Sequence, residues 1–283
     1  SCSGNGVRPL NEDGFLLAGC PVETLLAQFS EMCFDAVVLC MSVFHSPYTR
    51  DPVTAASIEN VRNAFPDAAL IAADAYFGAM HYIGYSPEGF FNNYPDVDYL
   101  IQGESESALA ELLDDLPERG SPPLSITGKG ITRLDTLPYP AWHLIEIERY
   151  WEFISRFLAA TRRKEDFSTI RRIIPAVTSR GCLFRCSFCC QSINGKQILY
   201  RRYSSAYIRG YLEKMKKNYS LEGIAILDGL ANGDGFSKRL DIFESLSLKV
   251  FFVNGLRADM LQPSHIRKLS RITPSLAVSA ESA

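Results

Sequence analysis

Residues 173–191 read IIPAVTSRGCLFRCSFCCQ. The apolar start of this stretch, residues 173–178, has the composition of a buried strand. Three cysteines follow its carboxyl end at the spacing C-x3-C-x2-C: Cys182, Cys186 and Cys189. Thiolates are soft ligands that suit iron–sulfur clusters and zinc. Because three ligands in one short loop leave one metal position open, the stretch predicts a metal site that can bind a small molecule.

The cysteine spacing, with Phe188 directly before the third cysteine, resembles the C-x3-C-x-aromatic-C signature of the radical S-adenosylmethionine (SAM) enzymes. Residues 178–181 resemble the lead-in of the branch of that family that carries a cobalamin-binding domain. The resemblance implies that the cysteines hold a [4Fe-4S] cluster whose fourth iron binds SAM, and that reduction cleaves SAM to a 5'-deoxyadenosyl radical. The residues alone also allow a zinc loop, with Cys190 or a distant residue as fourth ligand.

The composition is that of a folded protein: 283 residues, 47% hydrophobic and 22% charged. This length predicts one large domain or two ordinary ones. A net charge of -3 does not suggest a nucleic-acid-binding protein. No apolar run is long enough to cross a bilayer, and no signal peptide is visible. The eight cysteines therefore predict a cytoplasmic setting, with metal binding or core packing in place of disulfides.

Strand-like and helical segments alternate in the first part of the chain. Three short apolar runs are typical of buried parallel strands: residues 36–41, 68–73 and 97–102. Three segments carry apolar residues at helical spacing: residues 21–32, 52–65 and 105–116. The alternation predicts an α/β domain with a doubly wound, flavodoxin-like sheet. Ligands of such sheets bind at the carboxyl ends of the strands, which are Ser42, Asp74, Gly103 and Glu104.

Residues 22–116 resemble the cobalamin-binding domain that is fused to many radical SAM enzymes. The resemblance rests on residues 35–42, on Phe65-Pro66 before a strand, and on residues 97–106. It implies that four strand-end residues line the cobalamin: Ser42, Asp74, Gly103 and Glu104. Residues 72–75 read AADA, where the family commonly carries two glycines. A flavodoxin-like domain that only packs is the alternative.

A linker is predicted next, because residues 117–130 are rich in Pro, Gly and Ser. Residues 134–142, LDTLPYPAW, resemble the inter-domain connector of the same family, and their prolines predict an extended path. The predicted domain bounds are residues 1–120 for the cobalamin-binding-like domain, 121–172 for the connector and 173–283 for the second domain.

Further buried strands are predicted at residues 223–227, 250–253 and 276–278. With helices between them, they predict a (β/α) barrel whose chemistry lies on the loops after the strands. The resemblance implies that SAM contacts come from Phe188, Asp228, Arg257 and Glu281. Asp228 keeps only half of the acidic pair that the family carries, because Gly229 follows it. For Arg257 a surface ion pair with Asp259 is the alternative.

The whole chain resembles a cobalamin-dependent radical SAM enzyme, truncated at both ends, with only part of the radical SAM barrel visible. The activity implied is methylation of an unactivated carbon, and ring formation or rearrangement is the alternative within the family. The alternative outside it is a non-catalytic protein that binds zinc or an iron–sulfur cluster. The implied partners are a small-molecule or peptide substrate and an electron donor such as flavodoxin or ferredoxin, without nucleic acid or membrane.

Overall fold

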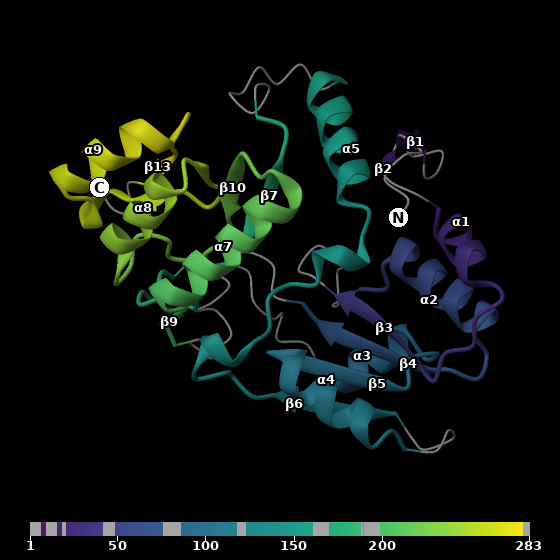
Figure 1. The fold of residues 1–283 in the computed structure, drawn as a ribbon. Helices are drawn as coiled ribbons and strands as arrows, with labels where there is room; N and C mark the ends of the chain where they lie inside the picture. Colours follow the sequence, from purple (N-terminus) through teal and green to yellow (C-terminus); the bar gives the residue numbers. More distant parts are fainter. Residues whose placement is uncertain are drawn as a thin grey trace. The chain divides into compact units, whose positions relative to one another are not determined.

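The fold is that of a computed structural model (Figure 1). The described residues are 7–9, 16–18, 21–41, 49–75, 86–117, 123–160, 170–187, 189 and 199–279. The chain divides into two compact units, of which unit 1 comprises residues 1–77 and 81–131, and unit 2 comprises residues 78–80 and 132–283. Each unit has its own parallel sheet.

The sheet of unit 1 has four parallel strands in the order β3-β4-β5-β6. Their bounds are β3 Ala36–Met41, β4 Ala69–Asp74, β5 Tyr99–Gly103 and β6 Leu124–Gly128. Strand β4 is buried along its whole length, which explains its uninterrupted apolar sequence. The three predicted strands are confirmed. β6 lies where a linker was predicted, and it was missed because this partly exposed strand contains Ser, Thr and Gly.

Helices cover both faces of this sheet (Figure 1). Their bounds are α1 Val22–Leu26, α2 Pro52–Ala64, α3 Pro87–Asn93 and α4 Ser105–Asp114, with a 3-10 turn, η1, at Ala27–Phe29. Ile58 of α2 and Phe90 of α3 pack with Leu70 on one face. Leu112 of α4 packs with Ile71 on the other face. This arrangement confirms an α/β fold with a parallel sheet flanked by helices.

Two helices of unit 1, α2 and α3, begin with a side-chain N-cap. Asp51 accepts a hydrogen bond from the backbone N–H of Thr54 at 2.7 Å, and Ser86 accepts one from Gly89 at 3.2 Å. A proline follows each capping residue. Such a cap satisfies a backbone donor that the first helical turn leaves without a partner.

Strand β3 is less covered than β4, and only Met41 in it is buried. The structure pairs β3 with β4 alone among the described strands. Cys33 and Cys40 are exposed, so the expectation that cysteines outside the metal loop pack in the core is wrong for these two.

A short antiparallel pair, β1 Val7–Pro9 and β2 Leu16–Ala18, precedes the sheet in the chain.

Unit 2 contains a parallel sheet in the order β11-β10-β7. Its strands are β7 Ile173–Ala176, β10 Gly223–Ile226 and β11 Lys249–Phe252. Two shorter pairs accompany it: β8 Ser179–Arg180 with β9 Arg201–Arg202, and β12 Leu256–Arg257 with β13 Val278–Ser279. Three of the four predicted strands form this open sheet in the described residues. The fourth, predicted at residues 276–278, is observed as the short strand β13, which pairs with β12. The predicted barrel therefore stays a prediction.

In unit 2, α5 precedes the first strand, and the other helices lie between strands in the chain. Their bounds are α5 Ile147–Ala160, α7 Ser205–Tyr219, α8 Phe236–Ser245 and α9 Pro263–Ile272, with 3-10 turns η2 Leu134–Thr136, η3 Trp142–Leu144 and η5 Ala258–Met260. Tyr139 of the predicted connector packs against Tyr207 and Tyr211 of α7, with ring centroids 4.8 and 5.4 Å apart. Trp142 donates a hydrogen bond to the Tyr211 hydroxyl at 2.8 Å. The connector is thus fixed to α7 within unit 2.

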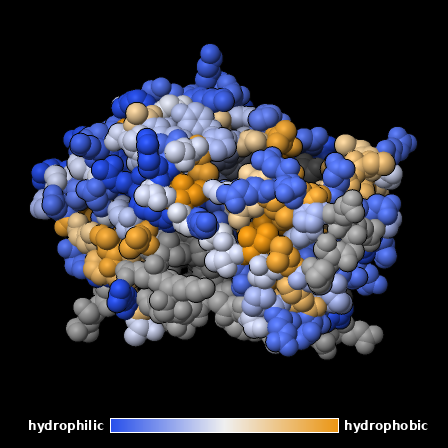
Figure 2. Space-filling model, turned by 90° about the horizontal axis from the view of Figure 1, so that it is seen from below, coloured by the Kyte–Doolittle hydropathy of each residue, from blue (hydrophilic) through white to orange (hydrophobic). Residues whose placement is uncertain are grey.

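The surface seen in Figure 2 is mostly hydrophilic, and its hydrophobic residues form separate small patches. No helix in the described part of the chain combines the length and the apolar character that crossing a membrane requires.

Candidate functional site

The three predicted cluster ligands lie in the loop that follows β8. Gly181 opens this loop with a φ of 78°, a conformation that residues with a Cβ rarely adopt. Cys182, Cys186 and Cys189 are partly buried. The backbone N–H of Cys189 donates to the carbonyl of Cys186 at 3.0 Å, so the second and third cysteines lie on one tight turn.

The donor chemistry of this loop fits an iron–sulfur cluster, which is held by thiolates. Burial raises the pKa of the Cys182 thiol, and the charges of Cys189 and Cys186 act in the same direction. Among the described residues, however, no three His, Cys, Asp or Glu side chains lie close enough together to hold a metal ion. The loop thus contains three cysteines of the right spacing, but their side chains are not close enough together in this structure to bind one metal ion.

Arg257 lies against the cysteine loop. Its guanidinium carbon is 3.6 Å from the ring centroid of Phe184, a cation–π contact with a residue between the first two cysteines. Its Nε and Nη2 atoms also donate to the carboxylate of Asp259 at 3.1 and 2.8 Å. The ion pair considered from the sequence is thus present. The Arg257 side chain is nevertheless only 15% exposed, and its charge acts to lower the pKa of Cys182.

Asn232 holds the backbone of Arg257 from the loop after β10. Its Oδ1 accepts from the Arg257 N–H at 3.1 Å, and its Nδ2 donates to the Arg257 carbonyl at 2.8 Å. Asn232 is 3% exposed, so these hydrogen bonds are shielded from water. Sequence reasoning missed this residue. A polar residue shortly after the end of a predicted strand was the available signal.

Asp228 is buried at the end of β10, where its carboxylate accepts three hydrogen bonds. The donors are the Thr178 N–H at 2.7 Å, the Thr178 hydroxyl at 2.5 Å and the Ser179 hydroxyl at 2.7 Å. Burial raises the pKa of Asp228, although these donors and the charge of Arg239 act to lower it. Asp228 therefore positions the backbone that leads into the cysteine loop. Its predicted contact with SAM stays a prediction.

Arg239 of α8 binds the backbone of the loop after β10. Its Nη1 and Nη2 atoms donate to the carbonyls of Asp234 and Ala231, each at 2.7 Å. Asn254, after β11, donates to the carbonyl of Asp228 at 3.1 Å. The loops that follow β7, β10 and β11 are therefore tied together by side chains. Two further predicted SAM contacts, Phe188 and Glu281, lie outside the described residues.

The predicted cobalamin contacts of unit 1 meet at the carboxyl edge of its sheet, except Ser42, which lies outside the described residues. Asp74 Oδ2 accepts from the Gly103 N–H at 2.8 Å, and Glu104 Oε2 accepts from the Ile131 N–H at 2.8 Å. Gly103 has a φ of 92°, and a Cβ there would lie 3.1 Å from the Gly128 carbonyl oxygen. Asp74, Gly103 and Glu104 thus hold this edge of the sheet together.

A pocket of about 350 Å³ opens between the end of β3 and the start of α2. Cys40, Met41, Asp51 and Thr54 are among its lining residues. The Thr54 hydroxyl is buried, and it has no hydrogen-bond partner in the part of the chain that the structure describes. A buried polar atom without a partner is costly unless a ligand or water completes it. The pocket lies beside the carboxyl end of β3, the edge at which ligands of such sheets bind.

Comparison with known proteins places the chain near methyltransferases. No protein-family model matches it. Over 120 residues, 42% of the chain, it is 30% identical to cytidylyl-2-hydroxyethylphosphonate methyltransferase from Streptomyces wedmorensis, covering 20% of that protein. Over 166 residues, 53% of the chain, it is 26% identical to an uncharacterized methyltransferase from Pyrococcus horikoshii, covering 32% of that protein. The chain spans a third or less of these relatives, and it is distantly similar to proteins named as methyltransferases.

Proposed function

We propose that this chain is part of a cobalamin-dependent radical SAM methyltransferase that methylates an unactivated carbon. The observation that carries the proposal is the C-x3-C-x2-C loop after β8, with Arg257 stacked on it and Asp228 holding its lead-in. The similarity to two proteins named as methyltransferases supports the methyl-transfer part. The proposal implies a one-electron donor such as flavodoxin or ferredoxin, and a small-molecule or peptide substrate.

The proposed roles in unit 2 follow from the contacts of its residues. Cys182, Cys186 and Cys189 hold a [4Fe-4S] cluster, which when bound supplies the electron that cleaves SAM. Arg257, held by Asn232 and Asp259, keeps a positive charge beside the loop, and this charge would attract the SAM carboxylate. Phe188, Asp228 and Glu281 complete the residues proposed to line SAM.

In unit 1 the carboxyl edge of the sheet is the proposed cobalamin site, formed by Ser42, Asp74, Gly103 and Glu104. The Asp74 and Glu104 carboxylates already accept backbone hydrogen bonds, so their role is to shape the edge on which the ligand lies. The pocket at the end of β3 offers additional space for part of the ligand.

Electron paramagnetic resonance on anaerobically reconstituted, dithionite-reduced protein tests the proposal. We expect a [4Fe-4S] signal that changes when SAM is added. Cys186→Ala should abolish the signal, whereas Cys33→Ala, which changes an exposed cysteine of unit 1, should leave it intact. A protein that binds only zinc, or a signal that SAM does not change, would contradict the proposal.

A second variant separates SAM binding from cluster binding. Arg257→Gln removes the charge beside the loop while the cluster remains. The SAM concentration that half-completes the change in the signal should therefore rise by about tenfold. Arg271→Gln, which changes an exposed arginine that pairs with Glu244 in the same unit, is the matched control. Equal responses of the two variants would remove Arg257 from the proposed SAM site.

A further inference from the structure

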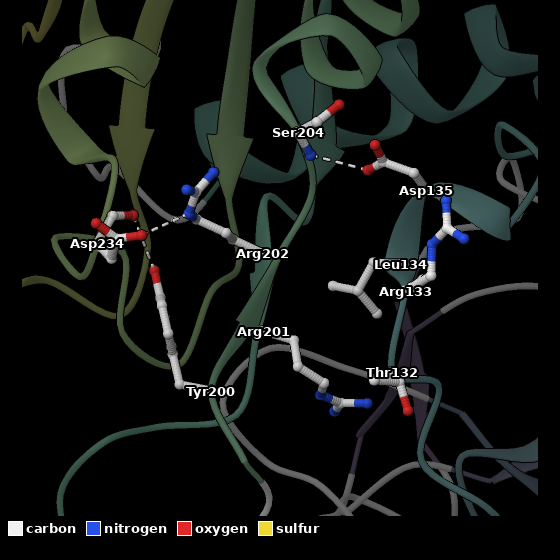
Figure 3. Close-up of a pocket in the computed structure, with 9 residues that line it drawn as sticks. All are labelled: Thr132, Arg133, Leu134, Asp135, Tyr200, Arg201, Arg202, Ser204 and Asp234. Atoms are coloured by element: carbon white, nitrogen blue, oxygen red, sulfur yellow. Dashed lines mark hydrogen bonds and ion pairs between the residues drawn. The ribbon is translucent and has the colours of Figure 1, made fainter.

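A second pocket lies in unit 2, and none of its lining residues belongs to the proposed cluster and SAM site. Its volume is about 460 Å³, and it is formed by residues 132–135, residues 200–202, Ser204 and Asp234 (Figure 3). The charged residues that line it are three arginines and two aspartates: Arg133, Arg201, Arg202, Asp135 and Asp234. Their ionised side chains together carry a net positive charge. These residues come from the connector, β9 and the loop before α8.

Both acidic side chains of this pocket are engaged by neighbours (Figure 3). Asp234 accepts a hydrogen bond from Arg202 Nε at 2.7 Å, and this contact lowers the pKa of the Asp234 carboxyl. Asp135 Oδ1 accepts from the backbone N–H of Ser204, the N-cap of α7, at 2.8 Å. The aspartates therefore fix the walls of the pocket.

Arg133 and Arg202 retain unused hydrogen-bond donors. Within the described residues, the Arg133 guanidinium makes no hydrogen bond or ion pair, and Arg202 uses only its Nε, so that both terminal nitrogens of Arg202 have no partner there. Gly235 lies beside Arg202, and its φ of 74° is a conformation that residues with a Cβ rarely adopt. In Figure 3 Arg201 extends from β9 toward Thr132, on the other side of the strand from Arg202.

We propose that this pocket binds the phosphate group of a phosphorylated small molecule. Guanidinium groups present parallel N–H donors that match two oxygens of a phosphate. The volume lies in the range of small-molecule sites and leaves space for more than the phosphate itself. Tyr200, which is half-buried, supplies apolar surface for the remainder of the molecule. The proposal is independent of cluster and cobalamin binding.

Isothermal titration calorimetry on the full chain, without reconstituted cluster, tests this inference directly. The probes are ribose 5-phosphate, ribose and inorganic phosphate. We expect saturable binding of ribose 5-phosphate that weakens as salt is raised, no binding of ribose, and weaker binding of inorganic phosphate. Tighter or equal binding of inorganic phosphate would overturn the assignment to a phosphorylated small molecule, and no saturable binding of either phosphate probe would overturn the site.

Variants locate the binding. Arg133→Gln and Arg202→Gln should each weaken ribose 5-phosphate binding by about tenfold or more, because each removes a charged donor. Arg209→Gln changes an arginine of α7 that contacts Glu213 and Ser245 outside the pocket, and it should leave binding unchanged. Thermal unfolding of each variant verifies that it is folded. Equal weakening by all three variants, or by none of them, would overturn the inference.

Discussion

At the scale of single residues, Asp228 shows how a buried carboxylate positions a loop. Its two oxygens accept three hydrogen bonds from Thr178 and Ser179, which immediately precede the cysteine loop in unit 2. A buried donor that loses its acceptor destabilises the fold more than the average hydrogen bond stabilises it. The residue was predicted as a ligand contact, and its observed partners are protein donors.

Asp228→Asn should lower the free energy of unfolding by about 1–3 kcal/mol, because the amide nitrogen cannot accept the hydrogen bonds that the replaced oxygen accepted. Urea denaturation of unit 2, followed by tryptophan fluorescence, measures this change. Asp241→Asn changes an exposed aspartate of α8, and it should lower the free energy of unfolding by less than half as much. Equal losses in the two variants would contradict the positioning role.

The hydrogen bonds of Glu222 predict that the stability of unit 2 depends on pH. Its carboxylate accepts from the N–H groups of Arg172 and Arg171 at 3.1 and 2.7 Å, and these hydrogen bonds lower its pKa from the usual 4.5. A lowered folded-state pKa contributes stability above the unfolded-state pKa, and this stability is lost as the pH falls through the folded-state pKa. The carboxylate therefore stabilises unit 2 at neutral pH and not in strong acid.

Glu222→Gln should reduce the free energy of unfolding at about pH 7 and have little effect at about pH 3. Because Glu222 is exposed, the difference at neutral pH should stay below about 1 kcal/mol. Urea titrations of both proteins at the two pH values measure it. A difference of the same size at both pH values would show that the carboxylate charge is not responsible.

At the scale of elements, β6 depends on a close backbone approach. A Cβ on Gly128 would lie 2.1 Å from the Glu104 carbonyl oxygen, so no larger residue fits without a shift of β6 or of the start of α4. Gly89 in α3 is different, since its added Cβ would meet only Ser86 atoms at 3.9 Å.

Gly128→Ala should therefore destabilise unit 1 by about 2 kcal/mol or more. The matched variant Gly89→Ala should be neutral or stabilising by up to about 1 kcal/mol, because alanine favours a helix. Thermal unfolding followed by circular dichroism measures both. Equal effects in both variants would mean that the contact at Glu104 does not constrain β6.

Elements with strong periodic signals were predicted well. Strands β4, β5, β10 and β11 are short apolar runs, and their burial selects such sequences. β3 has the same kind of sequence, although only its last residue is buried. β6 and α3 were missed. The first is partly exposed and the second has only seven residues, so neither needs a long apolar pattern.

At the scale of the whole molecule, the two compact units allow a test of independent unfolding. Both tryptophans, Trp142 and Trp151, lie in unit 2, where they donate hydrogen bonds to Tyr211 and to the Ile173 carbonyl. Tryptophan fluorescence therefore reports on unit 2, whereas circular dichroism reports on both units.

In the Gly128→Ala variant, the circular dichroism transition should begin at a lower temperature, while the fluorescence transition stays within about 1–2 °C of the unchanged protein. The reason is that the substitution strains only unit 1. Matching shifts of the two signals would show that the units unfold as one cooperative body.

The amino-acid sequence by itself determined the strands of both sheets except β6, the cysteine spacing and the polar residues at strand ends, because these depend on local periodicity and spacing. Only the tertiary structure decided what those polar residues contact. Asp228 binds Thr178, fifty positions away, and Arg257 stacks on Phe184. The pocket of Arg133 and Arg202 likewise joins distant segments. Such contacts depend on how the elements pack, and no local pattern encodes that packing.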